Sequence, residues 1–230
     1  MFNYQRISST KSFGGGRVVF TGQELGISSG RYDATLADLP DRTNGCLPTG
    51  TPILMDDHAK TIKIHYAFEV YEAVSYLQNA TSVVVKLRKQ YEGSRAKVGM
   101  IIGLAPTTAT GEVAMPLTIT AIDRTNESYD SVTCSCSAAS ANGTIALAAT
   151  LVEVEENDDD NKFYIKVLPN AFTFYDVVKH PDAQEVFFDG VFCQPDGVLL
   201  TRRIPPIADC IKEYLRGEGN VYMRYSTSEE

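Results

Sequence analysis

Apolar and polar positions alternate along much of the chain between residues 61 and 156, and this pattern predicts a strand-rich region. In TIKIHY, the side chains of Ile62, Ile64 and Tyr66 share one face of an extended chain, because successive side chains of a strand point to opposite sides. Further strand patterns are SVVVKLR (82–88), KVGMIIGLAP (97–106) and ATLVEVEE (149–156). Short strands separated by turns roughly every 8–12 residues are typical of a small barrel or sandwich. We therefore expect a small central β-barrel over residues 61–156.

The segment LTITAIDRTNESYDSVTCSCSA, residues 117–138, predicts two strands joined by a polar loop without proline. In the first strand, Leu117, Ile119 and Ala121 are expected to share one face. In the second strand, Val132 and Cys134 are expected to alternate with serine and threonine side chains. The pattern of this segment indicates β-strands and contains no catalytic motif.

Residues 1–60 show no sustained apolar period and predict an extended arm. Only RVVF (17–20) and TPILM (51–55) are candidate short strands. Large apolar side chains nevertheless recur along the arm, at Phe13, Phe20, Leu25, Tyr32, Leu36 and Leu39. A segment this apolar is unsuited to a free linker, so we expect it to lie on its own domain or on a neighbouring subunit. The Gly14–Gly16 triplet permits a sharp or mobile entry to it.

Residues 157–230 predict a C-terminal α+β portion. KFYIKVL (162–168) alternates as a strand, and two further strands flank a QPDG turn at 194–197. A single amphipathic helix is expected in PPIADCIKEYLRGEGN, where apolar residues recur at helical spacing. These residues are Ile207, Cys210, Ile211, Tyr214 and Leu215. The last strand is NVYMRYS, so the whole chain is expected to be mainly β.

Charge and composition narrow the classes of function. The chain has 230 residues, 43% of them hydrophobic, and a formal net charge of −8. An acidic protein is poorly suited to nucleic acid, because phosphate contacts need clustered lysine and arginine. The basic run KLRKQYEGSRAK (86–97) favours a solvated strand end, with a patch for an anionic ligand as the alternative. The acidic run EVEENDDDNK (153–162) favours a solvated loop, because a calcium loop needs alternating ligands and a glycine.

No membrane segment or secretory signal is visible, since no stretch approaches the roughly 20 apolar residues of a membrane span. We therefore expect synthesis in a cytoplasm. The chain has five cysteines, and Cys134 and Cys136 are expected on one strand face as small buried side chains in a reducing compartment. No disulfide framework, metal site or cofactor is predicted.

Candidate catalytic chemistry is sparse. The three histidines are His58, His65 and His180, and only His58 has acids beside it, at Asp56 and Asp57. One histidine with two sequential carboxylates is common in ordinary turns, so we predict no catalytic residue. Tryptophan is absent, which weakens any prediction of sugar cleavage on aromatic platforms.

Several short motifs occur in order along the central region: VYEA (70–73), KVG (97–99), ITAID (119–123) and YD (129–130). Together with FFDGVF (187–192) and RRIPPIADCIKEYL (202–215), they resemble head fibre or capsid decoration proteins of tailed bacteriophages that infect Bacteroides-type gut bacteria. The stretch from GRYDATLADLP to LPTGTPILMDD is similar to the N-terminal arm of that family.

The resemblance implies a structural protein of the virion, without an active site. It would bind the major capsid protein on the outer capsid surface through the arm, after synthesis in the bacterial host cytoplasm. It would also be a homo-oligomer, with a trimer favoured, and contact neither nucleic acid nor membrane. Two other functions stay open: a carbohydrate-binding adhesion module, and an enzyme that uses His58 with Asp56 and Asp57.

Overall fold

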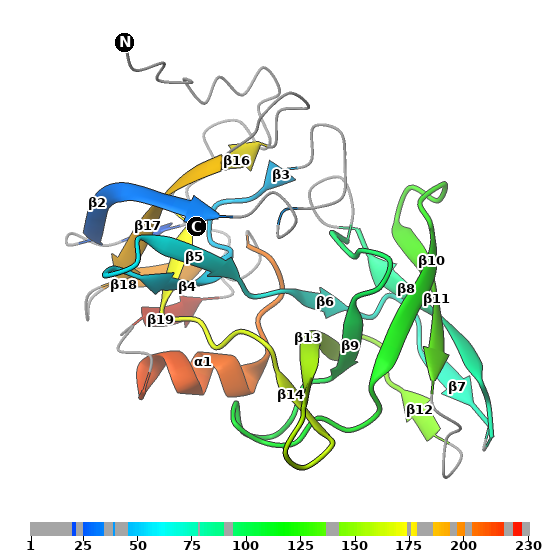
Figure 1. Cartoon of the computed structure of the whole chain (residues 1–230). Helices are drawn as coiled ribbons and strands as arrows, with labels where there is room; N and C mark the ends of the chain where they lie inside the picture. The colour runs from blue at the N-terminus through cyan, green and yellow to red at the C-terminus, as the bar shows by residue number, and fades with distance from the viewer. Residues whose placement is uncertain are drawn as a thin grey trace.

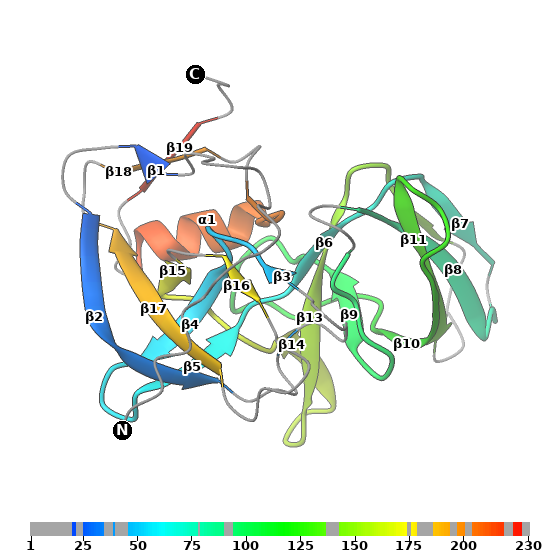
Figure 2. The same ribbon diagram turned by 90° about the horizontal axis from the view of Figure 1, so that it is seen from above.

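The computed structural model describes residues 20–21, 25–34, 39, 46–77, 79–89, 94–136, 143–173, 176–178, 186–193, 197–200, 204–218 and 223–226. Within these residues the chain is mainly β, with several sheets and one α-helix (Figure 1). Two groups of strands lie side by side, one around the helix and one around the central residues (Figure 2). The expected fold class is confirmed at this level.

The larger sheet has seven strands and contains most of the central residues. Its pairing order is β14-β13-β9-β10-β11-β8, and β6 pairs with β13 off this path. The strands are β6 (Ala67–Glu69), β8 (Ser82–Arg88), β9 (Ile101–Leu104), β10 (Leu117–Asp123), β11 (Tyr129–Cys136), β13 (Thr150–Asn157) and β14 (Lys162–Ile165). A separate pair lies beside it, formed by β7 (Val74–Tyr76) and β12 (Gly143–Ile145).

The closed central barrel predicted over residues 61–156 is wrong. The strand pairings of this sheet do not return to its start, because β6 and β8 share no ladder and the backbone is bridged there at the single pair Val70 and Leu87. The backbone N–H of Tyr71 also donates to the carbonyl of Lys86 at 2.8 Å. Beyond Tyr71 the chain enters β7, which pairs with β12 and not with β8, so the two ends of the sheet are not joined further.

The expected alternation is confirmed for β11, and β8, for which only a strand was predicted, alternates in the same way. Val83, Val85 and Leu87 are buried, as are Val132 and Cys134 opposite them. On β10, Leu117 and Ile119 are buried, but a β-bulge between Ile119 and Ala121 shifts the register and leaves Ala121 exposed. A bulge adds one residue to one strand and so reverses the side chains that follow it.

A second group of strands combines both ends of the chain. It consists of β2 (Leu25–Ala34), β4 (Pro52–Asp56), β5 (Thr61–Ile64), β15 (Ala171–Thr173) and β17 (Val186–Cys193). The pairings β15-β17-β2-β5-β4 close into a ring, in which β2 and β5 share one register pair, Asp33 with Thr61. The smaller sheets are β1 (Phe20–Thr21) with β18 (Gly197–Leu200) and β19 (Met223–Ser226), and β3 (Cys46–Leu47) with β16 (Val177–Val178).

Residues 25–34 and 46–56 therefore do not form the extended arm that the sequence predicts, because they contain paired strands. β2 is a ten-residue strand that pairs along its length with β17, and β4 pairs with β5 and β15. Of the strands in these two ranges, the sequence predicts only the one at 51–55, and it is observed as β4. β17 lies far along the sequence from β2, so the apolar pattern of residues 25–34 gives no sign of its partner.

The single predicted helix is present as α1 (Asp209–Arg216). It begins at Asp209, directly after Ala208, whose extended backbone (φ −63°, ψ 147°) forms the N-cap. The predicted stripe is buried at Cys210, Ile211 and Leu215, and Ile207 is buried just before the helix. The N–H of Gly217 donates to the carbonyls of Glu213 and Tyr214 at 3.1 Å and ends the helix. No described helix is long and apolar enough to cross a membrane.

Candidate functional site

Two of the sequence motifs meet on the outer side of the larger sheet. Tyr71 of VYEA and Tyr129 of YD lie with their ring centroids 5.0 Å apart and their planes tilted by 34°. The Nζ of Lys86 lies 5.1 Å from the ring centre of Tyr129, and the guanidinium of Arg88 lies 5.3 Å from that of Tyr71. We call Tyr71, Tyr129, Lys86 and Arg88 the aromatic–cationic cluster. It joins segments from β8, β11 and the end of β6.

Carboxylates already engage both cations of this cluster. The guanidinium of Arg88 donates to Glu69 at 2.6 Å, and Lys86 donates to Glu72. The hydrogen bond to Glu72 raises the pKa of Lys86, which keeps this side chain charged. Partly exposed pairs of this kind contribute little to stability. The prediction of a solvated strand end therefore fits only Lys86 and Arg88, because Lys89 and Arg95 of the same run are largely buried.

Directly beside the cluster, Asp130 is buried, with 0% exposure. Its Oδ2 accepts the N–H of Ser94 at 2.9 Å and the hydroxyl of Ser94 at 2.8 Å. Two cations face it: Lys89 Nζ at 3.4 Å and Arg124 Nε at 3.9 Å. We call Asp130, Ser94, Lys89 and Arg124 the buried charge cluster.

The same cations fasten the neighbouring loops. Lys89 donates to the carbonyl of Arg124 at 2.7 Å and also to that of Asn126, and Arg124 donates to the carbonyl of Ala96 at 2.8 Å. Asp130 pairs with both cations and accepts from Ser94, so the cluster links the loop before β11 to the segment before β9. A buried charge that is both paired and hydrogen-bonded in this way is costly to disrupt. The sequence shows Asp130 only as part of a motif and does not reveal its burial.

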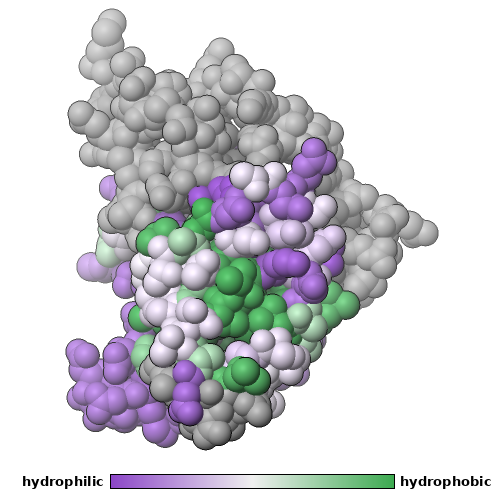
Figure 3. All heavy atoms as spheres, turned by 90° about the vertical axis from the view of Figure 1, so that its right-hand side faces the viewer, coloured by the Kyte–Doolittle hydropathy of each residue, from purple (hydrophilic) through white to green (hydrophobic). Residues whose placement is uncertain are grey.

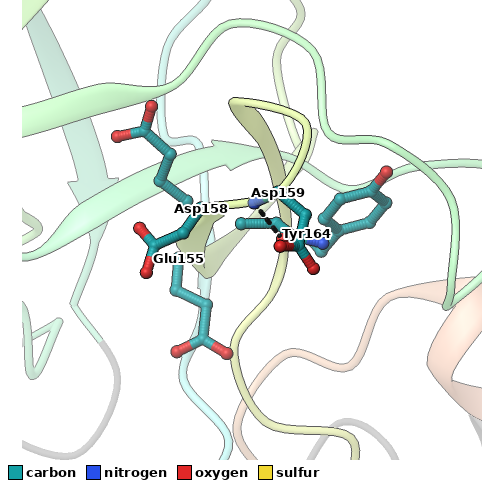
Figure 4. Close-up of a pocket in the computed structure, with 6 residues that line it drawn as sticks. Glu155, Asp158, Asp159 and Tyr164 are labelled. Carbon is teal, nitrogen blue, oxygen red and sulfur yellow. Dashed lines mark hydrogen bonds between the residues drawn. The ribbon is translucent and has the colours of Figure 1, made fainter.

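The acidic run forms the turn of the β13–β14 hairpin, where Asn161 N–H donates to Asn157 O at 2.9 Å. A hollow of about 470 Å³ lies against it, lined by Glu155, Glu156, Asn157, Asp158, Asp159 and Tyr164. The labelled carboxylates point in different directions, and Asp159 N–H donates to Asn157 Oδ1 at 2.9 Å (Figure 4). Among the described residues no three His, Cys, Asp or Glu side chains are grouped so as to hold a metal ion.

The trio His58, Asp56 and Asp57 is arranged as a turn between β4 and β5. Asp56 Oδ1 accepts the backbone N–H of His58 at 2.9 Å and that of Ala59 at 2.8 Å. Asp57 Oδ1 accepts the hydroxyl of Tyr32 and the ammonium of Lys60, both at 2.6 Å. The hydrogen bond from Lys60 holds the pKa of Asp57 below its usual value. Both carboxylates thus have structural partners in place of the imidazole.

These contacts suggest that the Tyr32 hydroxyl helps to close the strand ring. We expect Tyr32→Phe to lower the free energy of unfolding by about 1 kcal/mol, the usual net value of one hydrogen bond. The matched control is Tyr164→Phe, which removes an exposed hydroxyl that donates to Asp160 at 2.7 Å and should change stability by less than about 0.5 kcal/mol. Urea denaturation followed by circular dichroism measures both variants, and equal losses would contradict a role for Tyr32 in closing the ring.

His65 lies where the chain passes from β5 to β6. Its ring is buried, and Nδ1 donates to the carbonyl of Val167 at 2.7 Å, in the return segment between β14 and β15. Nε2 has no hydrogen-bond partner. Burial lowers the pKa of His65 to about 4, because removal from water disfavours the charged ring. His65 therefore joins the two connections between the strand groups as a neutral side chain.

Three cysteines are free thiols, of which Cys134 and Cys210 are buried and Cys136 is partly buried. Burial raises the pKa of Cys134 to about 12, so the reactive thiolate is scarce at neutral pH. The prediction of small buried side chains is confirmed for Cys134, whereas Cys136 is only partly buried.

The six apolar residues predicted to dock the arm fall into three groups. Tyr32 and Leu39 are 0% and 1% exposed, so they pack inside this chain and are not available for an external surface. Phe20 and Leu25 lie on β1 and β2. Phe13 and Leu36, like His180, lie outside the described residues.

Comparison with known proteins gives no relative: no family profile, curated protein or solved structure matches this chain.

Proposed function

We propose that this chain is a structural virion protein that binds the outer surface of a phage capsid as a decoration or head fibre protein. It acts through surface contacts with the major capsid protein, without catalysis, and works as a homo-oligomer. The proposal extends the motif resemblance to the folded molecule.

The observation that carries the proposal is the convergence of the four central motifs in one sheet. Val70 bridges to β8, and the N–H of Gly99 donates to the carbonyl of Ile119 on β10 at 2.8 Å. Gly99 has a φ of +87°, a conformation that glycine adopts without strain and other residues adopt rarely. Tyr129 and Asp130 begin β11 beside these segments. The motifs thus specify one structural unit, which is what a shared fold requires.

The charge distribution also supports an outer-surface role. The chain carries −8, and the exposed acidic hairpin repels nucleic acid, so packaged DNA is an unfavourable neighbour. Because Tyr32 and Leu39 are buried, the capsid contacts in this proposal must come from other residues. Many weak contacts on a repeating lattice suffice for attachment, because binding at several points is multivalent.

Co-sedimentation with capsids tests this function. Purified full-length chain is mixed with capsids assembled from the major capsid protein of the encoding phage and lacking this chain. Saturable binding to the capsids, with much weaker binding to unassembled capsid subunits as the control, is the expected result. Failure to sediment, together with absence of the chain from purified virions by mass spectrometry, would overturn the proposal.

A carbohydrate-binding module is the second candidate, and the Tyr71–Tyr129 pair favours it, because aromatic rings on a sheet surface can stack on sugars. Here the two rings are only partly exposed and each has a cation over it, which leaves less ring surface for a sugar. A glycan array distinguishes the two functions: binding that is lost in Tyr129→Ala would support the module.

A further inference from the structure

The outer side of β8, β11 and β10 is a sheet face with side chains arranged in cross-strand rows. The register places Ser82, Ser135 and Thr118 in the first row. Val84, Thr133 and Ala121 form the second row. Lys86, Ser131 and Asp123 form the third row. We call these three rows the outer face.

The first two rows carry no charge, although the chain as a whole has a net charge of −8. At their centre Val84 is 51% exposed, although it is a large apolar side chain on a strand. Figure 3 views the molecule from the side on which these strands lie, and apolar and weakly polar surface occupies the middle of this view, with hydrophilic surface toward its edges. An uncharged, β-branched sheet face of this kind is suited to packing against a second sheet.

The third row has opposite charges at its two ends, with Lys86 on β8 and Asp123 on β10. Consider a second copy turned over by a two-fold axis that runs along β11. This rotation places β8 of one copy opposite β10 of the other and keeps each row at its own level. Lys86, which already donates to Glu72 of its own chain, then faces Asp123 of the other copy as a second carboxylate, and the reverse contact forms on the other side of the axis.

The same rotation matches shapes in the second row. Val84, the largest side chain of that row, faces the small Ala121 of the other copy, while Thr133 faces its own equivalent on the axis. Ala121 is available for this contact because the bulge in β10 leaves it exposed. A contact that repeats itself in this way is isologous and closes as a dimer.

We propose that the outer face is a self-association surface, through which two copies of this chain stack sheet on sheet about a two-fold axis along β11. Lys86 and Asp123 pair between the copies, and Val84 packs on Ala121. The absence of charge in the first two rows lets two acidic chains approach at this face. This inference is independent of capsid binding.

Analytical ultracentrifugation of the full chain tests the proposal with two matched arginine variants. We expect a dimer for the unmodified chain, and a rise of about tenfold or more in the dimer Kd for Val84→Arg, because the symmetry places two unpaired charges in the contact. Leu104→Arg is the control, since Leu104 is 38% exposed on β9, lies opposite Leu151 of β13 and belongs to none of the three rows. It should leave the dimer intact.

A cysteine placed on the axis tests the geometry itself. Thr133→Cys should form a disulfide between copies under mild oxidation, whereas Leu104→Cys and the unmodified chain should not. The oligomeric state is measured over a 100-fold range of concentration that ends at the solubility limit. A chain that stays monomeric over this whole range would overturn the proposal. So would a dimer or trimer that Val84→Arg leaves unchanged, because self-association would then use another surface.

Discussion

Replacing Asp130 with asparagine is expected to lower the free energy of unfolding by about 3–5 kcal/mol. Asparagine preserves the shape of the side chain but removes the negative charge that faces Lys89 and Arg124. The side chain of Lys89 is mostly buried and cannot recover its hydration without movement of the loops. Urea denaturation measures the loss, followed by circular dichroism because the chain has no tryptophan.

Glu112→Gln is the control for this prediction, since it removes the charge of an exposed pair, with Lys162 at 2.8 Å. It should cost less than about 1 kcal/mol, because water screens both partners. If both variants lose the same stability, Asp130 contributes no more than a surface charge and the role assigned to the buried charge cluster is wrong.

Acidification is expected to destabilise the fold through His65. In the unfolded chain the ring titrates near its ordinary pKa of 6.5, whereas in the fold its pKa is about 4. Above pH 6.5 both states are neutral and His65 causes no pH dependence. Between pH 6.5 and 4 only the unfolded chain binds the proton, so stability falls as the pH falls. The total loss is roughly 3 kcal/mol, at 1.36 kcal/mol for each pH unit.

His65→Asn isolates this contribution, because its amide can still donate to Val167 but cannot take up a proton in this range. Unfolding is measured at several pH values between 8 and 4. The variant should lose less stability than the unmodified chain over this range, whatever its stability at pH 8. His58→Asn is the control at an exposed histidine and should keep the full pH dependence. Parallel curves for His65→Asn and the unmodified chain would contradict the prediction.

Elements whose pattern is local were predicted well. The strands at 82–88 and 129–136 and the helix at 209–216 were anticipated because their apolar residues recur at the period of the element they form. The reversal after Ile119 was missed, since a bulge depends on the pairing with β11 and leaves no mark on the order of residues in β10.

Long-range pairing was not predictable from such patterns. The strands on either side of the QPDG turn belong to different sheets: β17 pairs with β2, and β18 pairs in parallel with β19. Tyr32 is buried because β2 pairs with β17. Without knowledge of this pairing, an apolar residue at position 32 is equally consistent with an exposed docking residue and with a core residue. Asp130 is similar, because a polar residue in a motif becomes a buried anchor only when Lys89 and Arg124 are brought to it.

The amino-acid sequence was therefore sufficient for the mainly β class, the helix, the solvated acidic loop and the order of motifs, all of which depend on neighbouring residues. The ring formed by both ends of the chain, the open central sheet, the buried charge cluster and the uncharged outer face emerged only in the folded molecule. These features depend on which distant strands share backbone hydrogen bonds and in what register. The register between strands decides that Val84 lies beside Thr133, and that Thr133 lies beside Ala121. The sequence of any one strand does not contain this information, because it does not show which residues of the neighbouring strand lie opposite.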